Sequence, residues 1–439
     1  MKTLSMLKKG EKNVKTFESN IEFAKKKDRE DQLRHLRERF IIQENVIYMD
    51  GNSLGLCSKD AKEALYHVMD MWEQHGIEIW SVENSRYFSY QNILGEKLAK
   101  LICANANEVT VMTNTTINIH QGISTFYQPT KERYKILVDD LNFPTDRYAV
   151  DSQVKLKGYK VEEAVKVIPS RDGRLISEED IIEGMTDDVA LILLPSVLYR
   201  SAQLLDMKRI TEEAHKRGII IGWDLCHSIG VVPHDFQEIS PDFAVWCNYK
   251  YLSAGPGAIA GFYINRKHFA KEPGLAGWHG NKKETQFKLL NEFDHELNAH
   301  GWQTGTQPLF SMAPLEGVLN IFHEAGIENI RMKSLELTAY LMYLTDERLA
   351  QYGYVIGNPR EDEKRGGHVC LEHEEAYRIC KALKAHKVIP DYREPNVIRL
   401  APIALYNSYE EVYNLVAILE EIMISKEYEH YNNERTLVV

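Results

Sequence analysis

The stretch GIIIGWDLCHSIG, residues 218–230, followed by FAVWCNYKYLSAGPGAIAG, residues 243–261, decides the fold class of this chain. Each stretch begins with a short apolar run of the kind that forms a strand buried on both faces of a parallel sheet. Asp224 ends the first run, and Lys250 comes just after the second. Ligands of such sheets bind just beyond the strand ends, so we expect these two side chains to meet at one site.

An aspartate and a lysine at neighbouring strand ends match the needs of pyridoxal 5'-phosphate (PLP). The lysine binds this cofactor covalently through its amino group, and the carboxylate pairs with the ring nitrogen. Asp224 could instead cap a helix that follows it. His227 would lie on the same side as Asp224 if a helical turn begins there, where it could orient the aspartate, contact the cofactor, or be an ordinary core histidine.

The rest of the chain predicts an α/β fold with two lobes. From about 108 to 265, apolar segments alternate with polar helical stretches, which is typical of a large domain with a mainly parallel sheet flanked by helices. After about 310, a long helical region precedes the segments VIGNP, HVCLEH and VIRLAPIALYN, and a helix is expected from Ser408 to about Lys426. We therefore expect an N-terminal segment over 1–60 that packs on the small domain, a large domain over 61–310, and a smaller α+β domain over 311–439.

Composition favours an enzyme that acts on a small molecule. The net charge of −11 argues against a general binder of nucleic acid or anionic membranes, since both need clustered positive charge. No apolar run approaches the roughly 20 residues that span a bilayer, and the first 20 residues lack the apolar core of a signal peptide. We expect a cytoplasmic protein. The six cysteines are scattered, which favours reduced, mostly buried thiols over a metal or redox role.

Further candidates follow other predicted strands. Thr115 and Thr116 begin an expected helix, where free backbone N–H groups and hydroxyls bind phosphate, although threonines are also ordinary helix caps. In FPTD, Phe143 could stack on a pyridine ring with Asp146 nearby, or the segment could be a plain proline turn. Arg399 interrupts an apolar strand, and an interior arginine needs an anion, either a substrate carboxylate or a structural ion-pair partner.

These motifs together resemble kynureninase, a family of aminotransferase-like, fold-type-I PLP enzymes. The likeness runs over nearly the whole chain, through YMDGNSLG, TNTTINIH, NFPTDRYAVDS, LLPSVLYRSAQLLDM, WDLCHSIG, WCNYKYLSAGPGAIAG, GLAGWHG, GTQP and VIRLAPIALYNS. It implies the hydrolysis of L-kynurenine, or of its 3-hydroxy form, to anthranilate or 3-hydroxyanthranilate and L-alanine. That reaction belongs to tryptophan degradation by the kynurenine pathway. Gly305-Thr306 resembles the bacterial pattern, which favours kynurenine itself.

The resemblance also implies roles for single residues. Lys250 would hold PLP and act as general base, Asp224 would pair with the ring nitrogen, and Tyr249 would be the proton donor. The remaining cofactor contacts would come from Thr115, Thr116, Phe143, Asp146, Ser196, His227, Tyr249, Trp278 and Thr306, with Trp278 and Thr306 supplied by the second subunit of a homodimer. Arg399, Ser53 and Trp80 would bind the substrate.

Two other readings stay open on the residues alone. Another fold-type-I activity would be an aminotransferase or a cysteine desulfurase, of which the latter needs a mobile, exposed nucleophilic cysteine. Cys370 lies in a predicted strand, which disfavours that activity. A catalytically silent binding protein with the same fold would lack the covalently bound cofactor, and the presence of both Asp224 and Lys250 disfavours it.

Overall fold

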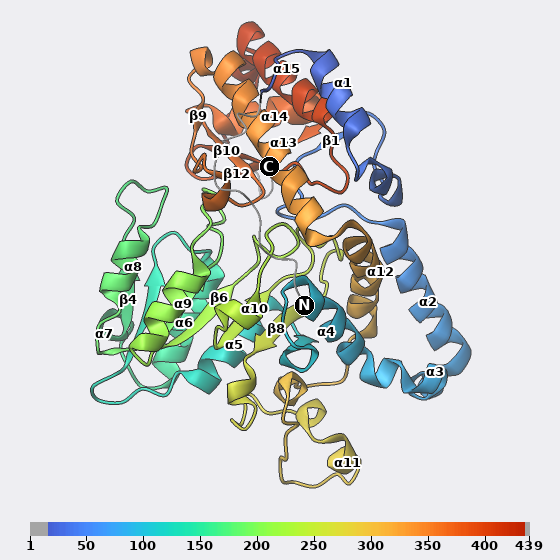
Figure 1. The fold of residues 1–439 in the computed structure, drawn as a ribbon, viewed down its shortest axis with the longest axis vertical. Helices are drawn as coiled ribbons and strands as arrows, with labels where there is room; N and C mark the ends of the chain where they lie inside the picture. The colour runs from blue at the N-terminus through green and yellow to red at the C-terminus, as the bar shows by residue number, and fades with distance from the viewer. Residues whose placement is uncertain (1–15, 435–439) are drawn as a thin grey trace, which may run out of the picture.

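The computed structural model describes residues 16–434, which form two lobes stacked along the long axis of the molecule (Figure 1). The larger lobe contains a seven-stranded sheet in the order β2-β8-β7-β6-β5-β3-β4. Its strands are β2 Val109–Met112, β3 Lys135–Asp139, β4 Val165–Ile168, β5 Val189–Pro195, β6 Ile220–Asp224, β7 Phe243–Trp246 and β8 Ala260–Ile264. The five strands from β7 to β4 pair in parallel, whereas β8 runs antiparallel to both its neighbours. The predicted mainly parallel sheet is confirmed.

The larger lobe also contains helices, some of which cover this sheet and link its strands (Figure 1). They are α2 Lys59–His75, α3 Val82–Ser85, α4 Tyr90–Leu101, α5 Thr115–Phe126, α6 Pro144–Leu156, α7 Val161–Ala164, α8 Glu178–Gly184, α9 Met207–Lys216, α10 Phe236–Ile239, α11 Lys283–Gln286 and α12 Leu309–Ala325. Two of these helices, α8 and α9, begin after the side-chain caps Ser177 and Asp206.

The strands β6 and β7 place the key side chains at one edge of the sheet. Their register pairs Gly222 with Phe243 and Asp224 with Val245. A Cβ atom at Gly222 would lie 2.1 Å from the Phe243 ring, so glycine lets the aromatic side chain pack against the neighbouring strand. Both strands are almost wholly buried, as their apolar runs predict.

The smaller lobe has a four-stranded antiparallel sheet in the order β12-β13-β10-β9 and a two-stranded parallel pair of β1 with β11. The strands are β1 Ile47–Tyr48, β9 Val355–Ile356, β10 Val369–Glu372, β11 Val388–Ile389, β12 Asp391–Arg393 and β13 Val397–Leu400. The helices are α1 Ile21–Glu30, α13 Ile327–Arg348, α14 Ala376–Ala385 and α15 Tyr409–Ser425. Ser408 and Glu411 form a capping box at the start of α15, close to the predicted helix start.

Short 3-10 helices join these elements. They span Arg34–Arg39, Gly76–Trp80, Tyr87–Ser89, Ala106–Glu108, Arg266–His268, Trp278–Gly280, Ala299–Trp302, Ala350–Tyr352, Asp362–Lys364 and Glu427–His430. Helix α2 ends at Gly76, whose φ of 53° disfavours other residues.

Helix α12 packs into an apolar core of the larger lobe, whereas most of helix α13 packs into the core of the smaller lobe. Buried residues of α12 such as Leu315 and Phe322 belong to the core of the larger lobe, and α12 packs along α2. Buried residues of α13 from Leu337 onward belong to the core of the smaller lobe. Gly326, with φ of 75°, separates the helices. The core that the helices join therefore changes near residue 326, and the expected domain boundaries stay a prediction.

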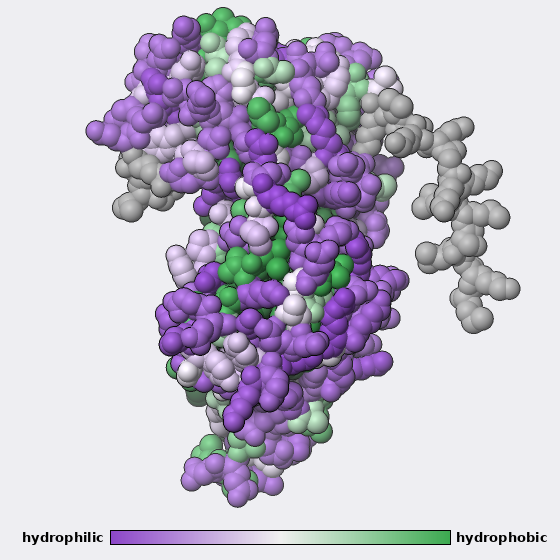
Figure 2. Space-filling model, turned by 90° about the vertical axis from the view of Figure 1, so that its left-hand side faces the viewer, coloured by the Kyte–Doolittle hydropathy of each residue, from purple (hydrophilic) through white to green (hydrophobic). Residues whose placement is uncertain are grey.

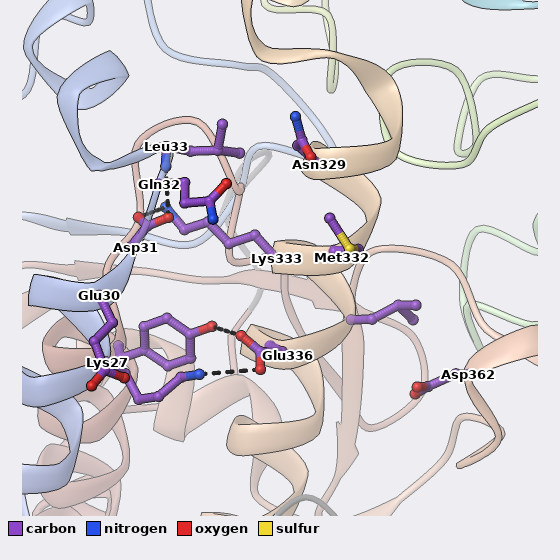
Figure 3. Close-up of a pocket in the computed structure, with 12 residues that line it drawn as sticks. Lys27, Glu30, Asp31, Gln32, Leu33, Asn329, Met332, Lys333, Glu336 and Asp362 are labelled. Carbon is purple, nitrogen blue, oxygen red and sulfur yellow. Dashed lines mark hydrogen bonds and ion pairs between the residues drawn. The ribbon is translucent and has the colours of Figure 1, made fainter. Parts of the chain in front are cut away.

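The N-terminal segment contacts both lobes. Helix α1 packs on α15, and Ala24 lies in the small core, whereas Leu36 and Phe40 lie in the large core. A pocket between α1 and α13, which we call the junction pocket, is lined by Lys27, Glu30, Asp31, Gln32, Leu33, Asn329, Met332, Lys333, Leu335, Glu336, Asp362 and Tyr409. Figure 3 shows Lys27 pointing at Glu336 across it. Its charged groups are largely paired across the two helices.

The face of the molecule drawn in Figure 2 is largely hydrophilic, with apolar side chains gathered at the level where the two lobes meet. Within residues 16–434, no helix is both long enough and apolar enough to cross a bilayer.

Candidate active site

A cavity of about 250 Å³ lies at the edge of the large sheet where β6 and β7 end. It is lined by Asn52, Ser53, Thr115, Thr116, Phe143, Thr145, Tyr199, Asp224, Cys226, His227, Tyr249, Lys250, Arg393 and Arg399. Nine of the predicted site residues therefore share one cavity. They come from six separate segments of the chain, including β13 of the smaller lobe.

Lys250 contacts His227 inside this cavity. The Lys250 Nζ lies 3.0 Å from His227 Nε2. Burial and the charge of Lys250 hold the pKa of His227 well below its usual range, so the imidazole is neutral and accepts this hydrogen bond. The pKa of Lys250 lies above its ordinary value. Burial acts to lower this pKa, but interaction with negative charge on Cys247, Cys226 and Asp224 raises it by more. His227 thus contacts the lysine, whereas the sequence suggested contact with the aspartate or cofactor.

Asp224 is held by its own turn and by a second carboxyl. Its Oδ1 accepts a hydrogen bond from the Cys226 backbone N–H at 2.7 Å, so the aspartate does cap the turn that follows. Asp146 is buried beside it, on α6. Burial and the charge of Asp224 raise the pKa of Asp146 well above its ordinary value, which favours the protonated form of Asp146.

Tyr249 precedes Lys250 and lies against Cys247. The charge on Cys247, followed by burial, raises the pKa of Tyr249 well above its ordinary value. The phenol therefore keeps its proton at neutral pH. A protonated phenol at the wall of the cavity can serve as a hydrogen-bond or proton donor.

The N-terminus of α5 opens toward the cavity. Its cap is the side chain of Asn114, which accepts a hydrogen bond from the Ile117 N–H. The hydroxyls of Thr115 and Thr116 are therefore not used as caps, and Thr116 Oγ1 lies 2.9 Å from Thr145 Oγ1. The free N–H groups of this first turn and the hydroxyls form a place for an anion.

Arg399 has a structural partner as well as a place in the cavity. Its guanidinium pairs with Asp391 on β12, and Nη1 donates to the Tyr199 carbonyl at 2.7 Å. Nη2 donates to Ser53 Oγ at 3.0 Å, which ties the smaller lobe to the N-terminal segment. The sequence left a structural ion pair and a substrate contact as alternatives, and the structure shows the ion pair at a residue that lines the cavity.

The remaining predicted site residues lie outside the cavity lining. Ser196 donates to the Asp224 backbone carbonyl at 3.0 Å and contacts Ser228 Oγ at 2.7 Å, so it supports the turn from behind. Trp278 donates its indole N–H to the Gln286 carbonyl, and Thr306 is exposed. Trp80 lines a separate apolar pocket of about 610 Å³ with Trp72 and Phe310 among its other residues.

Sequence reasoning missed five residues that line the cavity. Four of them lie inside the motifs that carried the resemblance, namely Asn52, Thr145, Tyr199 and Cys226. Their position next to recognised residues could have identified them. Arg393 lies in no such motif, and only the pairing of β12 with β13 brings it beside Arg399.

Comparison with known proteins identifies the family. A kynureninase of Geobacillus thermodenitrificans is 54% identical over 426 residues, which cover 97% of this chain and all of that protein. The chain belongs to the kynureninase family. The kynureninases of Bacillus anthracis and Shouchella clausii are 53% and 50% identical, over 96% and 95% of this chain and 99% and 97% of theirs. The kynureninase C-terminal domain family matches residues 330–419.

Solved structures show how far the fold extends beyond kynureninases. A cysteine desulfurase from Thermococcus onnurineus superposes with a TM-score of 0.76 at 18% identity, covering 89% of this chain and 98% of that one. A C-DES variant with glycine covalently linked to its PLP cofactor superposes with a TM-score of 0.77 at 18% identity, over 88% and 99% of the two chains. These likenesses confirm the predicted aminotransferase-like fold.

The cavity of this kynureninase family member fits PLP by the chemistry of its donors. A buried lysine amino group, a carboxylate with one free oxygen, and a helix N-terminus for phosphate all face one space. His227 Nδ1 is buried without a hydrogen-bond partner among the described residues, so it is available to a bound group. Phe143 is 40% exposed, and its ring centroid lies 5.8 Å from Lys250 Nζ, which leaves an aromatic face open to the cavity.

Proposed function

We propose that this chain hydrolyses L-kynurenine to anthranilate and L-alanine with PLP as cofactor. The observation that carries the proposal is the meeting of Lys250, Asp224 and Arg399 in one cavity of a kynureninase family member. PLP, when bound, supplies an electron sink for negative charge at the carbon next to the substrate amino group. The residues of the chain must then hold the cofactor, orient the substrate and move protons.

Cofactor binding falls to the large lobe. Lys250 would hold PLP covalently, Asp224 would pair with the ring nitrogen, and the α5 N-terminus would receive the phosphate through Thr115 and Thr116. Asp146 is buried near Asp224, and its raised pKa avoids a second negative charge beside that carboxylate. Phe143 offers its exposed face for stacking on the ring.

Substrate binding falls to the surface between the lobes. Arg399 would receive the substrate carboxylate, with Ser53 beside it at 3.0 Å. Asp391 fixes the guanidinium in orientation, which limits the rotation that the bound substrate could otherwise undergo. Arg393 lies in the same wall and adds positive charge toward the anion.

Proton transfer falls to neighbouring residues of one loop. The Lys250 amino group, once released by the substrate amine, would remove the proton from the substrate α-carbon. Tyr249 keeps its phenolic proton and would donate it as the carbon–carbon bond beside the ketone breaks. A water molecule must add to that ketone, so the aryl end of the substrate must stay accessible to solvent.

A homodimer would complete this site, with Trp278 and Thr306 reaching the partner's cavity. Support comes from exposed apolar side chains that line a pocket with Gln307, the residue after Thr306, since Trp72 is 58% and Ile77 is 81% exposed. The apolar pocket lined by Trp80 borders the same surface. Sedimentation of the purified protein would give a single species of twice the chain mass if this is correct.

The function is tested by the absorbance spectrum of the purified protein, followed by the addition of L-kynurenine. We expect an absorbance band from bound PLP and the release of fluorescent anthranilate with an equal amount of L-alanine. A parallel assay with 3-hydroxykynurenine ranks the two substrates. A PLP band with amino transfer to an α-keto acid and no anthranilate would overturn the proposal in favour of an aminotransferase.

A further inference from the structure

Two cysteines far apart in sequence are direct neighbours beneath the cavity. Cys226 follows β6 by two residues, and Cys247 follows β7 directly. The parallel register, which pairs Asp224 with Val245, continues beyond the strands, because Leu225 N–H donates to the Val245 carbonyl at 2.8 Å. Cys226 begins the turn that follows β6, and Cys247 directly follows the neighbouring strand β7.

The two cysteines are in contact. The Cys247 N–H donates to Cys226 Sγ at 3.2 Å, so the Cys226 sulfur lies against the backbone of Cys247. A disulfide requires Cα atoms roughly 4.4–6.8 Å apart. A sulfur that touches the neighbouring cysteine's backbone is within reach of such a bond.

One of the two sulfurs can be reached from solvent through the cavity. Cys226 lines the cavity wall beside Lys250, and its Sγ lies 4.0 Å from Thr115 Oγ1. Cys247 lies behind it and is buried. A small oxidant that enters the cavity meets Cys226 first, with Cys247 in position to react with the product.

The surroundings favour loss of a proton from Cys247, whereas burial raises the pKa of Cys226 well above its ordinary value. Burial acts to raise the pKa of Cys247, but the hydrogen bond from Cys226 and the charge of Lys250 bring it below its ordinary value. By contrast, burial raises the pKa of Cys370 to about 12. Thiolates are the reactive form of cysteine, so the pair beside Lys250 is distinguished from the other buried thiols.

We propose that Cys226 and Cys247 form a reversible disulfide when the protein meets hydrogen peroxide. The Cys226 thiol passes its proton to the Cys247 thiolate while its sulfur attacks one peroxide oxygen; the O–O bond breaks, leaving a sulfenic acid at Cys226 and a hydroxide that takes up a proton to become water. The Cys247 sulfur then attacks that sulfur, forming the S–S bond and releasing a second water. The two thiols lose two electrons to the peroxide, and a dithiol reductant restores them.

The cross-link itself does not depend on the proposed function, but its effect on turnover does. A disulfide would draw Cys226 away from Thr115 and Cys247 away from Tyr249, which alters two walls of the cavity. Displacing groups at a reaction centre by about 1 Å costs roughly 10²-fold in rate. We expect a loss of that size, recovered after reduction.

The test uses the PLP-loaded protein treated with hydrogen peroxide, alkylated under denaturing conditions and digested without reduction. We expect a peptide pair joined through Cys226 and Cys247, and an intact mass lower by about 2 Da, the mass of two hydrogens. A dithiol should remove both signals. The peptide map of the unsubstituted protein decides the matter even if a cysteine variant fails to fold.

Matched variants locate the reaction. Cys226→Ser and Cys247→Ser should each lose the cross-link, whereas Cys380→Ser, at a buried cysteine of the smaller lobe, should keep it. Sulfinic acid at Cys226 without a cross-link would overturn the proposal. So would oxidation confined to the exposed Cys57 and Cys103 while both buried thiols stay reduced.

Discussion

The cavity and the junction pocket each contain a lysine beside an aspartate, but the two lysines have different partners. Lys333 in the junction pocket pairs with Asp31 at 2.7 Å, and both side chains are 8% exposed. Lys250 in the cavity contacts a neutral imidazole, and within residues 16–434 no carboxylate forms an ion pair with it. An enclosed amino group without a paired carboxylate can react with a ligand, whereas a paired one holds two helices together.

The largest expected effect separates the two lysines by activity. Lys250→Ala should lower kynurenine turnover by about 10⁴-fold or more, because both the covalent link and the general base disappear. The PLP absorbance band should be lost with it. Turnover and absorbance of the purified variant are the measurements, with the exposed Lys271→Ala as the matched control. Retained activity would remove Lys250 from the site.

The reverse pattern is expected for Lys333. Lys333→Met leaves the Asp31 carboxylate buried and unpaired, which costs about 3–5 kcal/mol of folding free energy. Chemical denaturation measures that loss, while kcat per folded molecule should stay unchanged because Lys333 lies outside the cavity. The double variant Asp31→Asn with Lys333→Met should recover part of the stability. A variant that lost turnover but kept its stability would contradict the structural role.

The buried side chain of His234 should make the free energy of unfolding depend on pH. Burial lowers the pKa of His234 to about 4, and its Nε2 lies 2.9 Å from Ser228 Oγ. As the pH falls below about 6.5, His234 takes up a proton in the unfolded chain. In the folded chain it does so only near pH 4. Stability is therefore full above pH 6.5 and falls toward pH 4, by roughly 3 kcal/mol from this one group.

His234→Gln isolates that contribution, because glutamine keeps a polar atom near the serine but does not titrate. The difference in unfolding free energy between the two proteins should shrink as the pH falls from 6.5 to 4. A difference that stays constant over this range would mean that His234 is not the titrating group.

The smallest effect is expected at the rim of the junction pocket. Lys27 pairs with Glu336 at 3.1 Å, but the two side chains are 24% and 36% exposed. Lys27→Met should change the unfolding free energy by less than about 1 kcal/mol, since water screens exposed ion pairs. Lys27→Met and Lys333→Met are measured in the same denaturation experiment. A smaller loss of unfolding free energy in Lys27→Met would show that burial of the ion pair sets the size of the loss. Equal losses would contradict that explanation.

Much of the fold followed from short-range patterns. The apolar runs before Asp224 and Lys250 are strands because β-branched and aromatic residues suit a pleated, doubly buried surface. The long helical region after 310 was anticipated, but its division at Gly326 was not. That break depends on which core each helix joins, and a local pattern does not contain this information.

The sequence by itself determined the strand ends that carry Asp224 and Lys250, the capping of α15 by Ser408, and the family to which the motifs belong. The tertiary structure alone decided the pairing of Arg399 with Asp391, the contact of Lys250 with His227, and the adjacency of Cys226 and Cys247. The physical reason is the range of the interactions. Periodicity and capping act within a few residues, whereas these contacts depend on strand register and on the packing of two lobes.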